Sequence, residues 1–193
     1  MPKLYSKRPV YPHQKEIKQL VTAVIREFNE EEYYLIKNNL CERCINGRFA
    51  MHMQNRLQFT PFAGYTTDIE VDRGMGGNEG GKKMLSKKYD EDSYIYLDLI
   101  VYMRGYDNSL GFNNLLAIEF KKRGNSTESD HERLAGLVDD NKGFGYRAGF
   151  EIIIDRPSDN EHPKLHIEKE FYNLERGNYI YPGINDDIVI RNR

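Results

Sequence analysis

Residues 114–123 (NLLAIEFKKR) constrain the fold most, because an apolar run leads there directly into charged side chains. In a β-strand successive side chains point to opposite faces, so one face of this segment is wholly apolar, while Glu119 and Lys121 share the other. Charged groups at the end of a buried strand are costly to desolvate unless they are paired, hydrogen-bonded or bound to a metal. The segment therefore predicts a buried strand that ends in a candidate ionisable site.

A second predicted strand, residues 93–103 (SYIYLDLIVYM), is rich in β-branched and aromatic residues, and Asp98 is its one charged residue. The link at residues 104–113 is rich in Gly, Asn and Asp, which favour turns. The two strands therefore most simply form an antiparallel hairpin, which would place Asp98 beside Glu119 and Lys121. The alternative is a plain Asp98–Lys121 ion pair, with Glu119 exposed to solvent.

The remaining apolar periodicity predicts helices at residues 13–28, 29–37, 40–56 and 130–141, and strands at 65–73, 146–155, 164–172 and 188–190. Asn29 is the predicted N-cap of the second helix. We expect one α/β (α+β) domain over residues 1–193. It would comprise an N-terminal helical part (13–57), a core (65–155) and a C-terminal extension (156–193).

The third predicted helix carries a carboxylate in line with its apolar stripe. Ile45, Phe49 and Met53 form the stripe, and Glu42 lies three residues before it. At a helix start, an acidic side chain interacts favourably with the helix dipole. Glu42 is therefore either a helix-start charge or a residue that points into a site, and the sequence leaves both open.

The composition restricts the classes of function. With 39% apolar residues, 30% charged residues and a net charge of −2, the chain is typical of a globular protein. No apolar run reaches the ~18 residues of a membrane span, and the N-terminus lacks the apolar core of a signal peptide, so we expect a cytoplasmic protein without a membrane partner. Because the net charge is near zero, contact with nucleic acid would need local basic patches. The candidates are Lys3, Lys7 and Arg8; Lys82, Lys83, Lys87 and Lys88, in a Gly-rich loop at 74–92; and Lys121, Lys122 and Arg123.

Two further motifs are incomplete. Cys41 and Cys44 offer two ligands, whereas a structural zinc takes four. A thioredoxin-type motif would follow a strand, which these cysteines do not. We therefore expect Cys41 and Cys44 to be reduced, partly buried cysteines on a helix. Residues 76–83 (GGNEGGKK) nearly match a phosphate-binding P-loop. Lys83, however, replaces the Ser or Thr that ligates magnesium there, so a hairpin loop with a basic tip is expected instead.

The ordered set of motifs resembles the PD-(D/E)xK nuclease superfamily, and small bacterial members of it in particular. The matching stretches are Glu42–Arg43 with residues 48–50, then residues 98–101, then residues 114–122, which follow the pattern NLL-x-IE-x-KK. The resemblance covers roughly residues 40–155, and Leu97 stands where the family has a proline. It implies a restriction-endonuclease-like fold, in which a central mixed β-sheet is flanked by helices in the order α-β-β-β-α-β, here preceded by extra helices.

The resemblance also implies an activity, that of a metal-dependent endonuclease or exonuclease. Asp98, Glu119, Glu42 and the backbone carbonyl of Phe120 would bind Mg²⁺ or Mn²⁺, which activates a water molecule. Lys121 would orient that water or stabilise the charge that develops on the phosphate.

The expected partner is nucleic acid, with DNA as the expected substrate. Lys122 and Arg123 would contact its phosphates, as would the four lysines of the Gly-rich loop. Sequence specificity would come from loops, a partner subunit or a homodimer. The alternatives are a module on a nuclease fold that binds nucleic acid or protein without cutting, and an unrelated role such as a P-loop phosphatase or a structural subunit.

Overall fold

The computed structural model describes residues 14–71, 97–104, 113–138, 145–158 and 162–173. The helices in these ranges are α1 (Gln14–Glu31), α2 (Tyr33–Lys37), α3 (Glu42–Leu57) and α4 (Glu128–Val138), and the strands are β1 (Thr66–Val71), β2 (Leu97–Tyr102), β3 (Asn114–Lys122), β4 (Ala148–Ile154) and β5 (Leu165–Tyr172). They build a mixed sheet with helices on both faces, which confirms the α/β class expected from the sequence.

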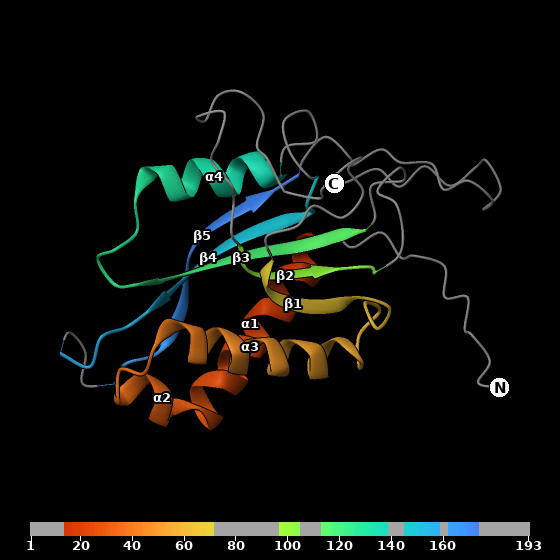
Figure 1. The fold of residues 1–193 in the computed structure, drawn as a ribbon. Coiled ribbons are helices and arrows are strands. Elements are labelled where there is room, and N and C mark those ends of the chain that lie inside the picture. Colours follow the sequence, from red (N-terminus) through yellow and green to blue (C-terminus); the bar gives the residue numbers. More distant parts are fainter. Residues whose placement is uncertain (1–13, 72–96, 105–112, 139–144, 159–161, 174–193) are drawn as a thin grey trace, which may run out of the picture.

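The five described strands lie side by side in chain order, β1-β2-β3-β4-β5. The β1–β2, β2–β3 and β4–β5 pairs are antiparallel, and the β3–β4 pair is parallel. A parallel pair needs a crossover connection, and α4 supplies it by crossing one face of the sheet (Figure 1). Helices α1 and α3 cover the opposite face.

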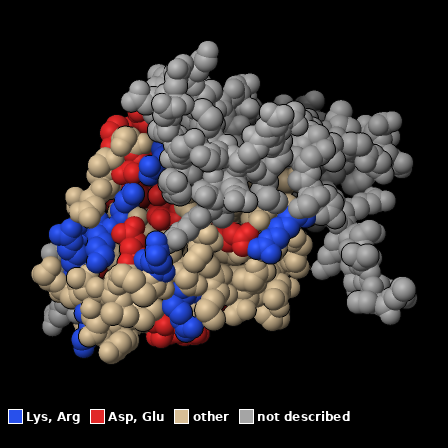
Figure 2. Space-filling model, viewed as in Figure 1, with Lys and Arg blue, Asp and Glu red and all other residues tan. Residues whose placement is uncertain are grey.

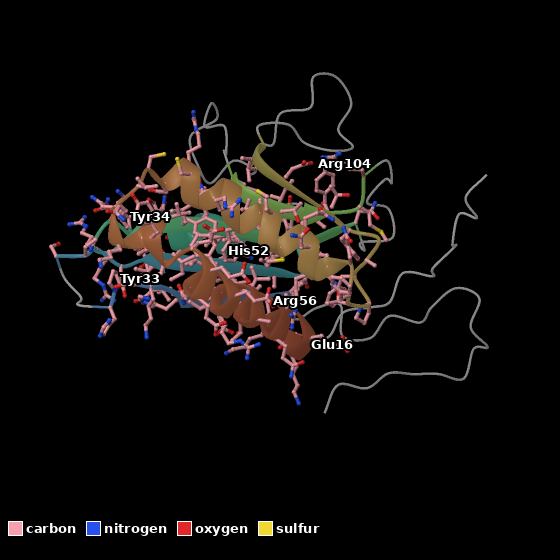
Figure 3. The ribbon with its side chains drawn as sticks, turned by 90° about the horizontal axis from the view of Figure 1, so that it is seen from below. Glu16, Tyr33, Tyr34, His52, Arg56 and Arg104 are labelled. Atoms are coloured by element: carbon pink, nitrogen blue, oxygen red, sulfur yellow. The ribbon has the colours of Figure 1, made fainter. Side chains whose placement is uncertain are left out.

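Each face of the sheet buries its own apolar core. On the face of α1 and α3, the Phe49 ring lies between those of Phe28 and Phe120, with centroid distances of 5.9 Å and 5.1 Å. On the other face, Leu134, Leu137 and Val138 of α4 pack on buried residues of β2 and β3. Figure 3 shows His52 and Arg56 in the seam between α3 and α1. There Arg56 Nη1 lies 2.5 Å from Glu27 Oε1, which joins the two helices.

Two predictions for the helical part are wrong. Asn29 is not an N-cap but lies inside α1, where its side chain donates to the carbonyl of Leu165 (2.9 Å) and accepts from its N–H (2.7 Å). This pair of hydrogen bonds ties α1 to β5. Cys41 and Cys44 are exposed rather than partly buried, because α3 begins at the protein surface.

Several predicted segments lie outside the described residues. They are the Gly-rich loop at 74–92 with the P-loop-like stretch, the first part of the strand at 93–103, and the strand at 188–190.

Helix α4 begins before residue 130 because Thr127 and Asp130 form a reciprocal capping box. Thr127 N–H donates to Asp130 Oδ2 at 3.0 Å, and Asp130 N–H donates to Thr127 Oγ1 at 3.3 Å. No helix in the described ranges is long and apolar enough to cross a membrane.

Candidate active site

Asp98 and Glu119 lie side by side on the adjacent strands β2 and β3. The antiparallel register pairs Leu99 with Ile118, and continuing it by one residue places Asp98 opposite Glu119. Oδ2 of Asp98 accepts a hydrogen bond of 2.7 Å from the Phe120 N–H, and the Asp98 carboxyl helps to raise the pKa of the Glu119 carboxyl beside it. The hairpin thus brings the two carboxyl groups together at the end of the sheet where β2 begins and β3 ends.

Glu119 is buried with 2% of its surface exposed, so the alternative in which it is exposed to solvent is wrong. Its Oε1 makes no hydrogen bond within the described residues, and Arg133 Nη2 lies 3.5 Å from that atom. Burial raises the pKa of this carboxyl to about 8; Arg133 and Lys121 oppose the shift, and Asp98 adds to it. Desolvation therefore outweighs the two nearby cations.

Helix α4 contributes two charged residues to this site, Asp130 and Arg133, which the sequence patterns did not predict. Asp130 Oδ1 lies 2.7 Å from Arg133 Nη2 and 3.3 Å from Lys121 Nζ, and Lys121 Nζ lies 3.8 Å from Glu119 Oε2. Burial opposes ionisation of Asp130, but hydrogen bonds from Thr127 and the charge of Lys121 outweigh it and lower the pKa of this carboxyl. The Thr127-x-x-Asp130 capping box was the signal in the sequence that could have placed Asp130 at the start of a helix.

Glu42, the first residue of α3, approaches the same cluster from the opposite layer of the fold. It is half-buried, and burial raises the pKa of its carboxyl; the charge of Asp98 adds to this shift, while Lys121 and Lys122 oppose it. Glu42 is therefore within electrostatic reach of Asp98 and both lysines. Figure 2 shows the result on the surface, where acidic and basic side chains are mixed in the band between α4 and α3.

The predicted phosphate-contacting residues differ in their surroundings. Lys122 Nζ donates to Asn39 Oδ1 at 2.9 Å and lines a pocket of about 560 Å³, together with Lys37 and Arg156. Arg123 Nη2 instead lies 2.5 Å from Oδ1 of the buried Asp155, in an ion pair. The other predicted residues, Lys82, Lys83, Lys87 and Lys88, lie outside the described residues.

The ionisable side chains continue across the sheet beyond Glu119. Glu151 on β4 is the register partner of Glu119, and Lys169 on β5 is the partner of Glu151. The Glu151 side chain is fully buried, with Oε2 at 2.7 Å from His131 Nε2 of α4. Sequence reasoning missed this residue because Glu151 stands inside an apolar run, and the parallel register that aligns it with Glu119 cannot be read from the chain.

The donor set at the strand ends suits a hard divalent cation. Mg²⁺ is typically bound by one or two carboxylates and keeps several waters and substrate oxygens as its other ligands. Asp98 and Glu119 provide two adjacent carboxyl groups, and Glu119 Oε1 is buried without a hydrogen-bond partner in the described part of the chain. No three or more His, Cys, Asp or Glu side chains are grouped to hold an ion in the ranges that the structure describes. The described residues therefore suit a divalent-cation site with two carboxylate ligands, Asp98 and Glu119.

Comparisons of the chain with models of protein families, with curated proteins and with solved structures found no match. The function must therefore be inferred from the geometry and chemistry of the site.

Proposed function

We propose that this chain is a metal-dependent nuclease of restriction-endonuclease-like architecture, which hydrolyses phosphodiester bonds of nucleic acid, with DNA as the expected substrate. One observation carries the proposal. Two carboxyl groups, Asp98 and Glu119, lie opposite each other on the adjacent strands β2 and β3, with the ammonium of Lys121 3.8 Å from the buried Glu119. Two carboxylates this close repel each other once both are ionised, and a divalent cation between them removes that repulsion.

Individual side chains of the site have different proposed roles in binding the ion and in cleavage. Asp98 and Glu119 would hold Mg²⁺ or Mn²⁺, and Glu42 lies close enough to contribute to the local negative field. When bound, the ion polarises the phosphate and makes an attacking water more acidic. Lys121 is held near Glu119 by Asp130 at 3.3 Å, so its ammonium is positioned to donate a hydrogen bond to that water or to a phosphate oxygen. Arg133 offsets part of the buried negative charge.

The pocket beside Lys122 supports contact with a polyanion. Lys37, Lys122 and Arg156 contribute three cationic side chains to its lining, and Lys122 adjoins the candidate site through its electrostatic interaction with Glu42. Contacts of Lys and Arg with phosphates position a nucleic acid without reading its sequence. We assign this pocket to a backbone phosphate near the scissile bond.

A module that binds nucleic acid without cutting is the second candidate, and the position of Arg133 favours it. Arg133 Nη2 and Lys121 Nζ lie 3.5 Å and 3.8 Å from the Glu119 carboxyl oxygens, so the chain itself supplies cations beside this group. In that case the cluster is a fixed ion-pair network, and it needs no metal to be neutral.

A cleavage assay separates the two candidates. Plasmid, single-stranded DNA and RNA are incubated with the purified chain in Mg²⁺, in Mn²⁺, in Ca²⁺ and in excess chelator. A nuclease cuts at least one substrate with Mg²⁺ or Mn²⁺ and none with chelator or Ca²⁺, because Ca²⁺ acidifies its bound water less. Substrate binding without cleavage under every condition would favour the non-cutting module, and cleavage in excess chelator would contradict the metal-dependent mechanism.

A further inference from the structure

The two cysteines of the chain meet at the start of α3. Cys41 is the N-cap of the helix and Cys44 lies in its first turn. Their Sγ atoms are 2.7 Å apart, and both residues are exposed. The chain contains two cysteines in total, so an intramolecular disulfide can form between these residues alone.

Backbone hydrogen bonds hold the turn that carries the two cysteines. The carbonyl of Cys41 accepts hydrogen bonds from the N–H of Cys44 at 3.0 Å and of Ile45 at 3.3 Å, so the first turn is closed. A disulfide bond is about 2.05 Å long, so the two sulfurs need to approach by only ~0.7 Å, which small rotations of the side chains allow. Exposure distinguishes this pair from the inert cysteines of a core, because a reagent can reach both sulfurs.

A zinc site is the main alternative for a Cys-x-x-Cys pair. A structural zinc takes four ligands, and the described residues contain no group of three or more His, Cys, Asp or Glu side chains that could hold an ion. The local fold differs from that of a thioredoxin-type enzyme, because helix α2 and residues 38–40 precede Cys41, where that motif would follow a strand.

We propose that Cys41 and Cys44 form a thiol–disulfide switch, which is oxidised by exchange with a small-molecule disulfide of the glutathione class. The thiolate of one cysteine attacks the small-molecule disulfide, forms a mixed disulfide and releases one small-molecule thiolate. The thiolate of the other cysteine then attacks the protein sulfur of the mixed disulfide, forms the Cys41–Cys44 bond and releases the second thiolate. The protein loses two electrons and two protons, and the small-molecule disulfide is reduced to two thiols.

The switch adjoins the candidate active site. Glu42 stands between the two cysteines in the sequence, and its carboxyl interacts with Asp98 and Lys121. Closure therefore restrains the helical turn that carries Glu42. The switch itself does not depend on the proposed nuclease activity, and its test requires no cleavage.

The test is intact-mass measurement of the reduced full chain after incubation with oxidised glutathione. The folded wild type should lose the mass of two hydrogen atoms and retain no glutathione. Because the second thiol is held beside the first, the closed form should exceed the glutathione adduct at least about tenfold. Cys41→Ser and Cys44→Ser each retain one cysteine, so both should accumulate the adduct, and a thiol reductant should reverse every product.

The same incubation in urea is the matched control for the contribution of the fold. The ratio of closed form to adduct should be higher in the folded chain than in the unfolded chain, because folding fixes the two sulfurs side by side. Three results would overturn the proposal: stable glutathione adducts on the folded wild type, no reaction of the folded wild type while the unfolded chain reacts, or an equal ratio in the two states.

Discussion

At the scale of single residues, burial decides the chemistry of the candidate site. Glu119 keeps 2% of its surface exposed, and the nearby cations Arg133 and Lys121 do not restore an ordinary pKa. Without an added cation the carboxyl therefore holds its proton to about pH 8. Under the proposed function, a divalent ion would have to displace that proton to bind at neutral pH.

Stability should depend on pH through Glu119. The pKa of this carboxyl is about 8 in the folded chain against an ordinary value of 4.5, so the folded state binds more protons than the unfolded state between these pH values. The free energy of unfolding should therefore fall as pH rises through this window, by up to about 1.4 kcal/mol per pH unit. Glu119→Gln should remove this fall, as measured by urea unfolding in chelator at several pH values. Glu30→Gln, at an exposed position of α1, is the matched control, and parallel pH profiles of Glu119→Gln and wild type would contradict the prediction.

Lys121 should matter for the chemical step and little for binding of the ion. Its ammonium lies 3.8 Å from Glu119 and is held by Asp130. Lys121 therefore lies beside the carboxylates that would bind the ion, and it is not itself a ligand of the ion. Lys121→Ala should slow cleavage by about 10²- to 10⁴-fold, the range of a general acid or base, while Mn²⁺ still binds. Lys15→Ala, on the exposed face of α1, controls for loss of a positive charge. Undiminished cleavage by Lys121→Ala would show that this lysine only stabilises the fold.

At the scale of elements, local patterns could be read from the sequence where they repeat along one segment. The spacing of Ile17, Leu20, Val21 and Val24 predicts α1, and alternation in residues 114–122 predicts β3 with Glu119 and Lys121 on one face. Asn29 could not be placed, because the partner that keeps it inside α1 is Leu165, 136 residues away. Asp98 and Glu119 stood out as charged residues in apolar strands, and Lys121 because it shares the strand face of Glu119. Glu42 stood out because it lies in line with the apolar stripe of its helix. Arg133 and Glu151 were missed because only tertiary packing brings them to the site.

The start of α4 should be sensitive to the cap that holds Asp130. Thr127 Oγ1 donates to Asp130 Oδ2 at 2.6 Å, and the same carboxylate lies 2.7 Å from Arg133. Thr127→Ala removes the cap and should lower the free energy of unfolding by about 1 kcal/mol. Thr22→Ala, at an exposed position inside α1, should be neutral or slightly stabilising, because alanine has the higher helix propensity. Equal urea midpoints for Thr127→Ala and wild type would contradict a role for the cap.

At the scale of the whole molecule, the site lies where the two helical layers meet the end of the sheet. Glu42 comes from α3 on one face, and Asp130 and Arg133 come from α4 on the other. Strands β2 and β3, which carry Asp98 and Glu119 at adjacent register positions, lie in the sheet between these two helices (Figure 1). Hydrophobic periodicity predicted the individual helices and strands, but it did not show which charges they bring together, because those depend on how closely α4 approaches the sheet.

Gly149 of β4 permits that close approach. A Cβ atom at this position would lie 3.2 Å from Val138 Cγ2 and 3.5 Å from Leu134 Cδ2 of α4. Gly149→Ala should therefore force Val138 and Leu134 to shift by a few tenths of an ångström within their buried cluster, and lower the free energy of unfolding by about 1 kcal/mol, the lower end of the cost of overpacking a core. Gly47→Ala, where a Cβ meets nothing within 4 Å, is the matched control and should stabilise α3, because alanine favours a helix. An unchanged stability of Gly149→Ala would show that α4 packs less tightly than described.

Calorimetric titration of Mn²⁺ into the folded chain tests the nuclease proposal most directly, because it asks whether the two carboxyl groups bind a cation at all. Wild type should bind Mn²⁺ with a stoichiometry set by the Asp98–Glu119 site, and heats measured in buffers of different ionisation enthalpy should reveal release of a proton at neutral pH. Asp98→Asn and Glu119→Gln keep the shape of the side chains but remove a charged ligand, so each should weaken binding at least about tenfold, whereas Glu30→Gln should not. Absence of Mn²⁺ binding to wild type, or equal binding to Glu119→Gln, would contradict a metal-dependent site on β2 and β3.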